Sequence, residues 1–357
     1  MIAAFDNPLL SGPLLSGLLG DEKMATLLGV EAELATMLQF EKALADTEGA
    51  LGIVPAAAAS AIGRVLDNFR PEIQALRDAT ARDGVMVPEL VRQIRHAVGE
   101  PHSQHVHFGA TSQDVIDTAM ILRIRACIDL LEERLSALVV AFADLGHRFG
   151  DRPLVARTRM QAAIPISVAD RVTSWREPLV RHHARLQFVR GSILVVQFGG
   201  AAGTLEKFAD KGAAIRAALA RRLSLGDAPQ WHSQRDRIAE LANWLSLVTG
   251  GLGKFGQDIA LMAQTGDELQ RAGGGSSSAM AHKRNPIDAE MLVTLARYNA
   301  VQLSGMHHAL IHEQERSGAA WTLEWLILPQ MLMAAGASTC VADRLVRTIA
   351  AIGGKVD

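Results

Sequence analysis

Cysteine and aromatic residues are scarce in this sequence. Its 357 residues include two cysteines and one tyrosine, and aromatic side chains make up 4% of the chain. Two cysteines cannot form a disulfide framework, so we expect a protein of a reducing, cytoplasmic compartment. Both Cys127 and Cys340 lie in apolar helical patterns, where we expect them to be small core residues.

The sequence also lacks an excess of charge and long apolar runs. Its formal net charge of -2 gives no electrostatic reason to expect binding to nucleic acid or to an anionic membrane. We expect no apolar run to be long and charge-free enough to span a bilayer. The apolar N-terminus has no basic start and is interrupted by Pro8, Gly12 and Pro13, so no signal peptide is expected.

Helix-forming residues dominate what is present. Three stretches repeat apolar residues every three or four positions, which is the period of packed helices. They are Ile238, Leu241, Leu245, Val248, Leu252, Phe255, Ile259 and Met262; Val115, Ala119, Leu122, Ala126, Leu130, Leu138, Phe142 and Leu145; and Met291, Leu295, Tyr298, Gln302 and Met306. We therefore expect an all-α protein with a small N-terminal helical domain (residues 1–110) and a long central bundle (residues 111–357). Such apolar faces are expected to be buried in a homo-oligomer.

A glycine-containing stretch, "ILVVQFGGAAGTLEKF" (193–208), allows two interpretations. A strand, a glycine turn and a helix would suit a dinucleotide. However, the glycines at 199, 200 and 203 do not follow the G-x-G-x-x-G order, and no alternating strand and helix pattern surrounds them. A tight turn between helices is the better interpretation.

Three histidines occur close together in "PHSQHVHFGATSQD" (101–114). His102, His105 and His107 could share a zinc ion, but no cysteine accompanies them. The alternative is a surface loop with one histidine turned inward. Thr111 or Ser112 could cap the helix that follows, or its positive end could bind an anion.

A second loop, "GGGSSSAMAHKRNPIDAE" (273–290), joins glycine and serine to basic residues. Asn285 is a suitable N-cap, Pro286 suits a first helical turn, and the acidic residues that follow favour the positive helix end. Serine hydroxyls and Lys283 beside a helix start could hold anionic oxygen. A surface hinge with solvated charges explains the same residues, and pattern alone does not separate the two.

The second loop resembles the signature S-S-x-M-P-x-K-x-N-P-x-x-x-E of the fumarase/aspartase superfamily. The matching residues are Ser277, Ser278, Met280, Lys283, Asn285, Pro286 and Glu290, and Ala281 stands where proline is usual. "GATSQDVIDTA" (109–119) and "TRMQAAIP" (158–165) resemble the first and second conserved regions of that superfamily. "FGGAAGT" and "WHSQRDRIAEL" (231–241) are most similar to its branch of 3-carboxy-cis,cis-muconate cycloisomerases.

The resemblance implies a fold, an assembly and a set of site residues. It implies a homotetramer with shared active sites, a small-molecule polycarboxylate substrate, no cofactor and no metal. The usual C-terminal domain is expected to be largely absent. Ser277 matches the catalytic serine, and Lys283 and Asn285 match residues that hold a substrate carboxylate. The substrate-binding positions implied are His107, Thr111, Ser112, Gln113, Arg159, Gln161, Arg237 and Met280.

Arg159 departs from the superfamily pattern, which usually has histidine there as a proton donor to the leaving group. In a muconate lactonisation the group that attacks, or leaves in reverse, is a carboxylate whose acid has a pKa of about 4, so no proton donor is needed. A permanent cation that grips carboxylate bidentately is more useful. We therefore expect a cycloisomerase. The alternatives are an argininosuccinate- or adenylosuccinate-type lyase that releases fumarate, and a non-catalytic helical scaffold.

Overall fold

The computed structural model describes residues 14–354, except positions 277 and 281. The all-α prediction is confirmed, with two small antiparallel sheets added. The N-terminal part consists of α2 (Ser16–Leu19), α3 (Glu22–Leu28), α4 (Val30–Ala50), α5 (Ala56–Leu66), α6 (Ile73–Asp83), α7 (Val87–Val98) and the 3-10 turn η1 (Ser103–His105). It is followed by α8 (Ser112–Phe149), β1 (Pro153–Thr158), β2 (Gln161–Ser167), α9 (Val168–Ile193), η2 (Glu206–Lys211) and α10 (Gly212–Leu223). The last elements are α11 (Asp236–Thr265), β3 (Leu269–Arg271), α12 (Ile287–His308), α13 (Gly318–Thr348) and β4 (Ile349–Ile352).

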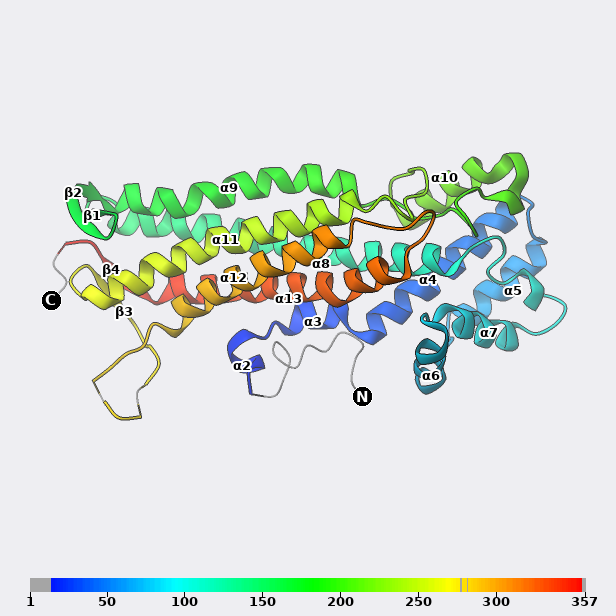
Figure 1. Cartoon of the computed structure of the whole chain (residues 1–357), viewed down its shortest axis with the longest axis horizontal. Helices are drawn as coiled ribbons and strands as arrows, with labels where there is room; N and C mark the ends of the chain where they lie inside the picture. The colour runs from blue at the N-terminus through cyan, green and yellow to red at the C-terminus, as the bar shows by residue number, and fades with distance from the viewer. Residues whose placement is uncertain (1–13, 277, 281, 355–357) are drawn as a thin grey trace.

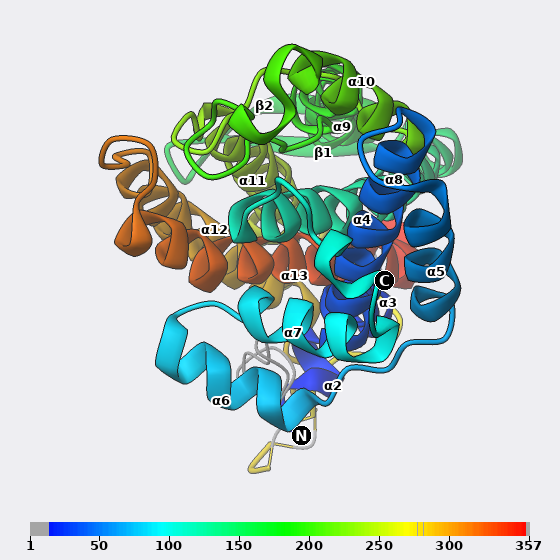
Figure 2. The same cartoon turned by 90° about the vertical axis from the view of Figure 1, so that its right-hand side faces the viewer.

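Five long helices, α8, α9, α11, α12 and α13, run side by side along the molecule (Figure 1). Helices α5, α6, α7 and α10 and the last turns of α4 gather at one end, around the start of α8, which we call the helical end (Figure 2). The two sheets, β1 with β2 and β3 with β4, lie at the opposite end. We call this the sheet end.

The core confirms the first apolar pattern fully and the third only in part. All eight α11 residues of the first pattern are buried. In α12, Leu295 and Met306 are buried, but Met291, Tyr298 and Gln302 are partly exposed. Within one chain the buried face of α12 is rotated toward Ala289, Leu292 and Asn299. Burial of the other residues of the third pattern against further copies of the chain stays a prediction.

Small residues let α11 and α12 approach closely. A methyl group added at Gly253 would lie 2.5 Å from the Cβ of Ala296, and one at Gly256 would lie 2.6 Å from the carbonyl oxygen of Ala289. Nearby, Phe142, Trp175 and Phe255 pack at ring distances of 4.9 to 6.3 Å. Burying each such ring stabilises the fold by about 1.5–3 kcal/mol, so this cluster fixes α8, α9 and α11 to one another.

Helix α13 corrects the expectation that no apolar run could span a bilayer. Its 31 residues are long and apolar enough by length and composition. However, 78% of its most apolar window is buried inside the protein. A helix that is apolar all round is expected at the centre of a bundle, which is where α13 lies, so this helix gives only weak evidence of membrane insertion.

Candidate active site

The first conserved region lies at the helical end, at the start of α8. Thr111 is the N-cap residue, and its backbone N–H donates to the carboxylate of Asp114 (3.1 Å). The same carboxylate accepts hydrogen bonds from the backbone N–H groups of Gly199 (2.8 Å) and Gly200 (2.9 Å). Its Oδ1 also lies 2.9 Å from Nε2 of His232. Asp114 is fully buried, so it joins the start of α8 to a turn far away in the sequence.

This arrangement decides between the two interpretations of residues 193–208. The glycines form a turn after α9 whose backbone binds Asp114, and no strand of a dinucleotide fold precedes them in the described chain. Gly200 has a φ of +70°, a left-handed conformation that glycine adopts without strain. The tight turn is therefore confirmed for the described residues.

Gln113, a predicted substrate-binding residue, is fully buried in a hydrogen-bond network. Its Nε2 donates to Asp117 (3.1 Å) and to the carbonyl of His232 (2.9 Å). Its Oε1 accepts from Nε of Arg316 (2.9 Å). Arg316 also donates to the carbonyl of Ala201 (3.1 Å), so it ties the loop before α13 to the first conserved region. Sequence reasoning missed Arg316 because no periodicity or spacing distinguishes it.

A buried ionic network lies one turn further along α8. Arg235 donates to Glu324 (2.8 and 2.5 Å) and to Asp117 (2.6 and 3.2 Å). The indole of Trp321 donates to Asp117 (2.9 Å). Burial disfavours the guanidinium charge, but the two carboxylates outweigh it and raise the pKa of Arg235 above its ordinary value. The network fixes the starts of α8, α11 and α13 relative to one another.

Arg237, the arginine selected from sequence, lies outside this network. Its guanidinium donates to the carbonyl of Ser192 at 2.7 Å, near the end of α9. Two residues along a helix point about 200° apart, so Arg235 and Arg237 face different neighbours. The substrate-binding role of Arg237 stays a prediction.

Of the three histidines in 101–114, His107 is turned inward. Its Nδ1 lies 2.6 Å from Oε1 of Glu41, and its side chain is 14% exposed. His102 and His105 are partly exposed. Among the described residues, no group of three or more histidine, cysteine, aspartate or glutamate side chains could hold a metal ion. The arrangement matches the surface loop with one inward histidine.

The second conserved region lies at the sheet end, in the hairpin of β1 and β2. Strand residues Thr158 and Gln161 are paired, which leaves Arg159 and Met160 as the two-residue turn. Their φ values of +46° and +68° are those of the tight turns that match strand twist. Arg159 and Gln161 are both exposed.

Arg159 lines an open cavity of about 720 Å³ that is rich in cations. Arg157, Arg171 and Lys254 share its wall, together with the acids Asp258 and Glu268. The two acids already have partners. Asp258 accepts from the indole of Trp175 (2.7 Å) and from Lys254. Glu268 accepts from the N–H of Val155 (2.7 Å). The wall thus holds four cations and two acids. Because Lys254 is paired with Asp258, the positive charge presented to a ligand comes mainly from the arginines.

The third conserved region is the loop between β3 and α12. Its base is closed by two backbone hydrogen bonds between Gly275 and Asn285, of 3.0 and 2.9 Å. Lys283 and Met280 are exposed. Ser277, the predicted catalytic serine, lies outside the described residues. The predicted N-cap was wrong by one residue, because the backbone of Asn285 is held in this pair and α12 begins at Ile287 after Pro286.

The described chain does not bring the three regions together. The first region begins α8 and the second follows its end, so the 38 residues of α8 hold them roughly 57 Å apart at about 1.5 Å per residue. The third region lies at the sheet end, with β3 and β4 (Figure 1). A site made from all three regions would need further copies of the chain.

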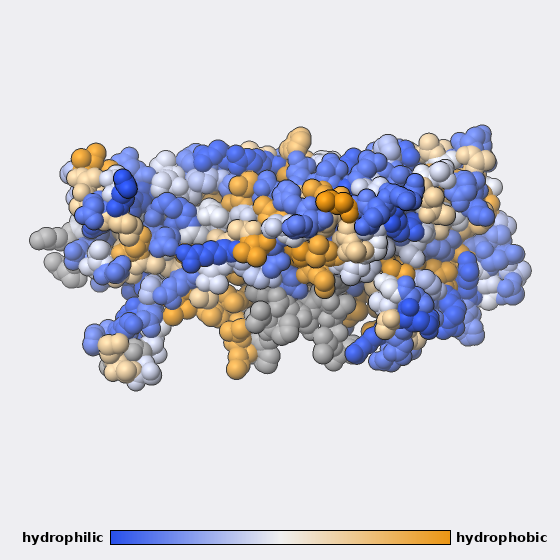
Figure 3. Space-filling model, viewed as in Figure 1, coloured by the Kyte–Doolittle hydropathy of each residue, from blue (hydrophilic) through white to orange (hydrophobic). Residues whose placement is uncertain are grey.

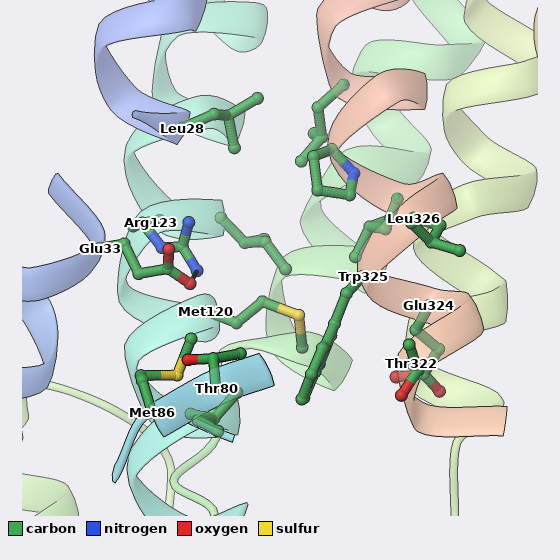
Figure 4. A pocket seen from close by; sticks show the side chains of 15 residues that line it. Leu28, Glu33, Thr80, Met86, Met120, Arg123, Thr322, Glu324, Trp325 and Leu326 are labelled. Carbon is green, nitrogen blue, oxygen red and sulfur yellow. Dashed lines mark hydrogen bonds and ion pairs between the residues drawn. The ribbon is translucent and has the colours of Figure 1, made fainter. Parts of the chain in front are cut away.

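An apolar cavity between α3, α6, α8 and α13 is a different kind of space (Figure 4). It has a volume of about 160 Å³ and is lined mainly by aliphatic and methionine side chains and Trp325. Arg123 at its wall pairs with Glu33 at 3.3 Å. Burial raises the pKa of Glu33 and outweighs the attraction of Arg123. The cavity is too apolar to suit a polycarboxylate.

Comparisons with known proteins show the family to which the chain belongs. The model of a family described as lyase matches residues 22–301. The chain is 38% identical to the 3-carboxy-cis,cis-muconate cycloisomerase of Bradyrhizobium diazoefficiens, over 93% of this chain and 75% of that enzyme. Among solved structures, the 3-carboxy-cis,cis-muconate lactonizing enzyme from Pseudomonas putida is 34% identical with a TM-score of 0.88, covering 97% of this chain and 77% of that one. The fumarate lyase from Mesorhizobium sp. BNC1 is 33% identical with a TM-score of 0.87, covering 93% and 76%.

The chain thus spans about three quarters of the length of these relatives. The matched range, residues 22–301, includes the hairpin and the loop before α12. Sequence, fold and the order of the motifs agree, and the chain belongs to the lyase family of the fumarase/aspartase superfamily.

Proposed function

We propose that the protein is a 3-carboxy-cis,cis-muconate cycloisomerase, which closes a tricarboxylate diene to a carboxymuconolactone. Relatives that bear this name match most of the chain at 34–40% identity. The observation that carries the proposal is the position of Arg159, at the tip of a hairpin and on the wall of a cavity that it shares with Arg157 and Arg171. A substrate with three carboxylates fits such a surface better than an amine-bearing succinate does.

The reaction requires little acid catalysis at its leaving group. A substrate carboxylate adds across the conjugated double bond, and negative charge develops on the carboxylate that activates it. In the reverse direction the departing carboxylate is stable as an anion, because its conjugate acid has a pKa of about 4. Arg159 therefore binds a carboxylate where many relatives have a proton-donating histidine. A guanidinium suits this because it can donate two parallel hydrogen bonds.

The loop before α12 supplies the remaining roles. Lys283, Asn285 and the positive start of α12 stabilise the charge that develops on the activating carboxylate. Ser277 delivers a proton to carbon, and in reverse it removes that proton. Loss of the hydroxyl in Ser277→Ala should therefore abolish proton transfer while leaving the carboxylate-binding cations in place. We assign no cofactor to this reaction.

We further propose a homotetramer with shared active sites, located in the cytoplasm. The distance along α8 between the first two regions supports shared sites. Exposed apolar residues on four long helices support burial against other copies: Val140, Phe188, Val301 and Leu326 are 67%, 70%, 71% and 65% exposed. Apolar patches are visible over the middle of the bundle (Figure 3). Cys127 and Cys340 are free thiols, as expected in a reducing compartment.

The direct test is turnover of 3-carboxymuconate by the purified protein, followed by its ultraviolet absorbance. We expect loss of the diene absorbance, activity that survives EDTA, and no fumarate. Mixed Ser277→Ala and Arg159→Ala subunits, refolded together, should recover part of the activity that each variant alone lacks. An active monomer by light scattering would contradict the shared site.

A fumarate-releasing lyase is the second candidate, because the Mesorhizobium sp. BNC1 fumarate lyase has the same fold. In addition, His107 is hydrogen-bonded to the carboxylate of Glu41, and a histidine in such a pair could act as a general acid. Accumulation of fumarate from an amine-bearing succinate, without turnover of 3-carboxymuconate, would favour it.

A further inference from the structure

One buried acid at the helical end contacts a predicted substrate-binding residue. Glu41 lies on α4, with its side chain 1% exposed, and its Oε1 is 2.6 Å from Nδ1 of His107. Glu41 is distant in sequence from every motif of the superfamily, and the residues around it gave no chemical signal. The contact joins the N-terminal helices to the loop that enters α8.

The backbone holds His107 in an uncommon conformation. Its φ is +61°, a left-handed value that residues other than glycine seldom adopt. Such a conformation persists only where the surroundings stabilise it. Here the next turn is also tight, since a methyl group added at Gly109 would lie 2.3 Å from the ring of Phe208. The loop therefore has little freedom to turn His107 elsewhere.

Three charged groups face His107 from the elements packed around it: Glu41 from α4, Asp114 from α8 and Arg95 from α7. Burial disfavours the imidazolium, and Arg95 also opposes it. The attraction and hydrogen bond of Glu41, together with Asp114, outweigh both effects and raise the pKa of His107. Asp114 is already bound by two backbone N–H groups and by His232, so Glu41 is the acid in direct contact.

We infer that Glu41 is a positioning residue that accepts a hydrogen bond from Nδ1–H of His107 and keeps its imidazole cationic, so that Nε2–H is presented to a carboxylate of the substrate. The inference rests on the proposed function for the identity of that carboxylate. A buried cation that is already paired with Glu41 can hold an anion at a pH where a solvated histidine has lost its charge. No proton needs to be transferred in this role, which agrees with a carboxylate leaving group.

The test compares Glu41→Gln with the parent. An amide oxygen can still accept the Nδ1 hydrogen bond, so the ring stays in place while the negative charge is removed. We expect kcat/KM to fall roughly tenfold or more at pH 8, mainly through KM, because a charge-assisted hydrogen bond is lost. The loss should shrink as the pH is lowered, because His107 without Glu41 regains its charge only at a lower pH than in the parent. Glu100→Gln, an exposed acid of the same loop that binds Ser103, is the matched control and should behave as the parent.

A second measurement is independent of turnover. In protein labelled with carbon-13 at histidine Cε1, the His107 signal is identified by its absence in His107→Gln. Its titration midpoint should fall in Glu41→Gln and remain elevated in Glu41→Asp, which retains the charge. If the midpoint is unchanged in Glu41→Gln, or if Glu41→Gln still lowers kcat/KM in a His107→Gln background, the inference is wrong.

The outcomes separate this inference from the proposed function. A lowered midpoint in a protein that does not turn over 3-carboxymuconate would reject the function and retain the positioning of His107. Turnover in the parent with a pH profile that Glu41→Gln leaves unchanged would reject the inference and retain the function. If Glu41→Gln does not fold, the titration of His107 in Glu41→Asp provides the test. A His107 midpoint at the ordinary histidine value in Glu41→Asp would contradict the role assigned to the negative charge.

Discussion

The two ends of the bundle use charged residues in opposite ways. At the helical end, Asp114, Asp117 and Arg235 are buried and each is hydrogen-bonded to several partners. At the sheet end, Arg157 and Arg159 are exposed on a hairpin, and the acids beside them are occupied by other donors. One end thus holds helices together through charge, and the other presents charge outward.

The difference shows which motif side chains already have hydrogen-bond partners within the chain. Gln113 and Asp114 belong to the first motif, yet their side chains are hydrogen-bonded to other residues of the same chain. Arg159 of the second motif has its side chain exposed. Changes at Asp114, Asp117 and Arg235 should therefore act on stability first, whereas changes at Arg159 should act on substrate binding.

The largest effect is expected at Arg235. Arg235→Ala leaves Asp117 and Glu324 buried without their cation, which should lower the free energy of unfolding by about 3–5 kcal/mol. Urea unfolding at a fixed protein concentration measures it. Arg237→Ala is the control, because Arg237 makes one hydrogen bond to a backbone carbonyl and should cost about 0.5–1.5 kcal/mol. Equal losses of unfolding free energy in the two variants would show that the ionic network does not stabilise the helical end more than a single hydrogen bond does.

A pH-dependent effect of intermediate size is expected at Glu48. This residue is fully buried on α4, and neither carboxylate oxygen has a hydrogen-bond partner within the described part of the chain. Burial, and then the charge of Glu41, raises the pKa of Glu48 to about 9. The folded state thus holds a proton that the unfolded chain releases near pH 4.5. The resulting stabilisation is complete below that pH and is lost as pH rises toward 9, on the order of 3 kcal/mol by pH 7.

Glu48→Gln removes this titration. We expect the difference in unfolding free energy between pH 5 and pH 8 to become smaller in Glu48→Gln than in the parent. Glu31→Gln changes an exposed acid of the same helix and should leave the parent profile intact. A profile that Glu48→Gln does not flatten would mean that Glu48 is solvated or paired in solution.

Periodicity in the sequence was enough to predict the helices and the α11 core, because a buried stripe every three or four residues follows directly from helix geometry. The motifs marked both loops of the candidate site and residues 158–165, but the β1–β2 hairpin that holds Arg159 was not predicted from the sequence. Glu41, Arg235 and Arg316 were missed because their partners lie 66 to 203 positions away, and no local pattern encodes such contacts. Asp114 had a detectable signal, since Thr111 followed three residues later by an acid forms a capping box.

At the sheet end, Arg159→Ala should reduce kcat/KM by about ten- to a hundredfold, because 1.5–3 kcal/mol of charge-assisted hydrogen bonding is lost. Stability should barely change. Arg159→Lys should recover part of the activity, since it keeps the charge and loses the planar donor pair. Steady-state kinetics at several pH values measures both, with Arg148→Ala as a control for removing an exposed arginine near the end of α8.

Arg159→His provides the sharper comparison. Near pH 8 a solvated imidazole is mostly neutral, so this variant should not recover cyclisation, although it restores the histidine usual in the superfamily. Parent-like cyclisation by Arg159→His at pH 8 would remove the argument that a permanent cation at this position favours the cycloisomerase.

The smallest effect is expected at Met160, beside Arg159 in the hairpin turn. Its φ of +68° is left-handed and its side chain is 69% exposed, so it contributes backbone strain and little packing. Met160→Gly should relieve that strain and raise the free energy of unfolding by about 0.5–1 kcal/mol. Ala162→Gly, in the adjoining strand, should instead lower the free energy of unfolding, because glycine there only increases the conformational entropy of the unfolded chain. If both substitutions destabilise the protein equally, the left-handed turn does not exist in solution. Arg159 would then not be held at the tip of the hairpin. The contrast between charged side chains bonded within the protein at the helical end and exposed ones at the sheet end would lose its geometric basis.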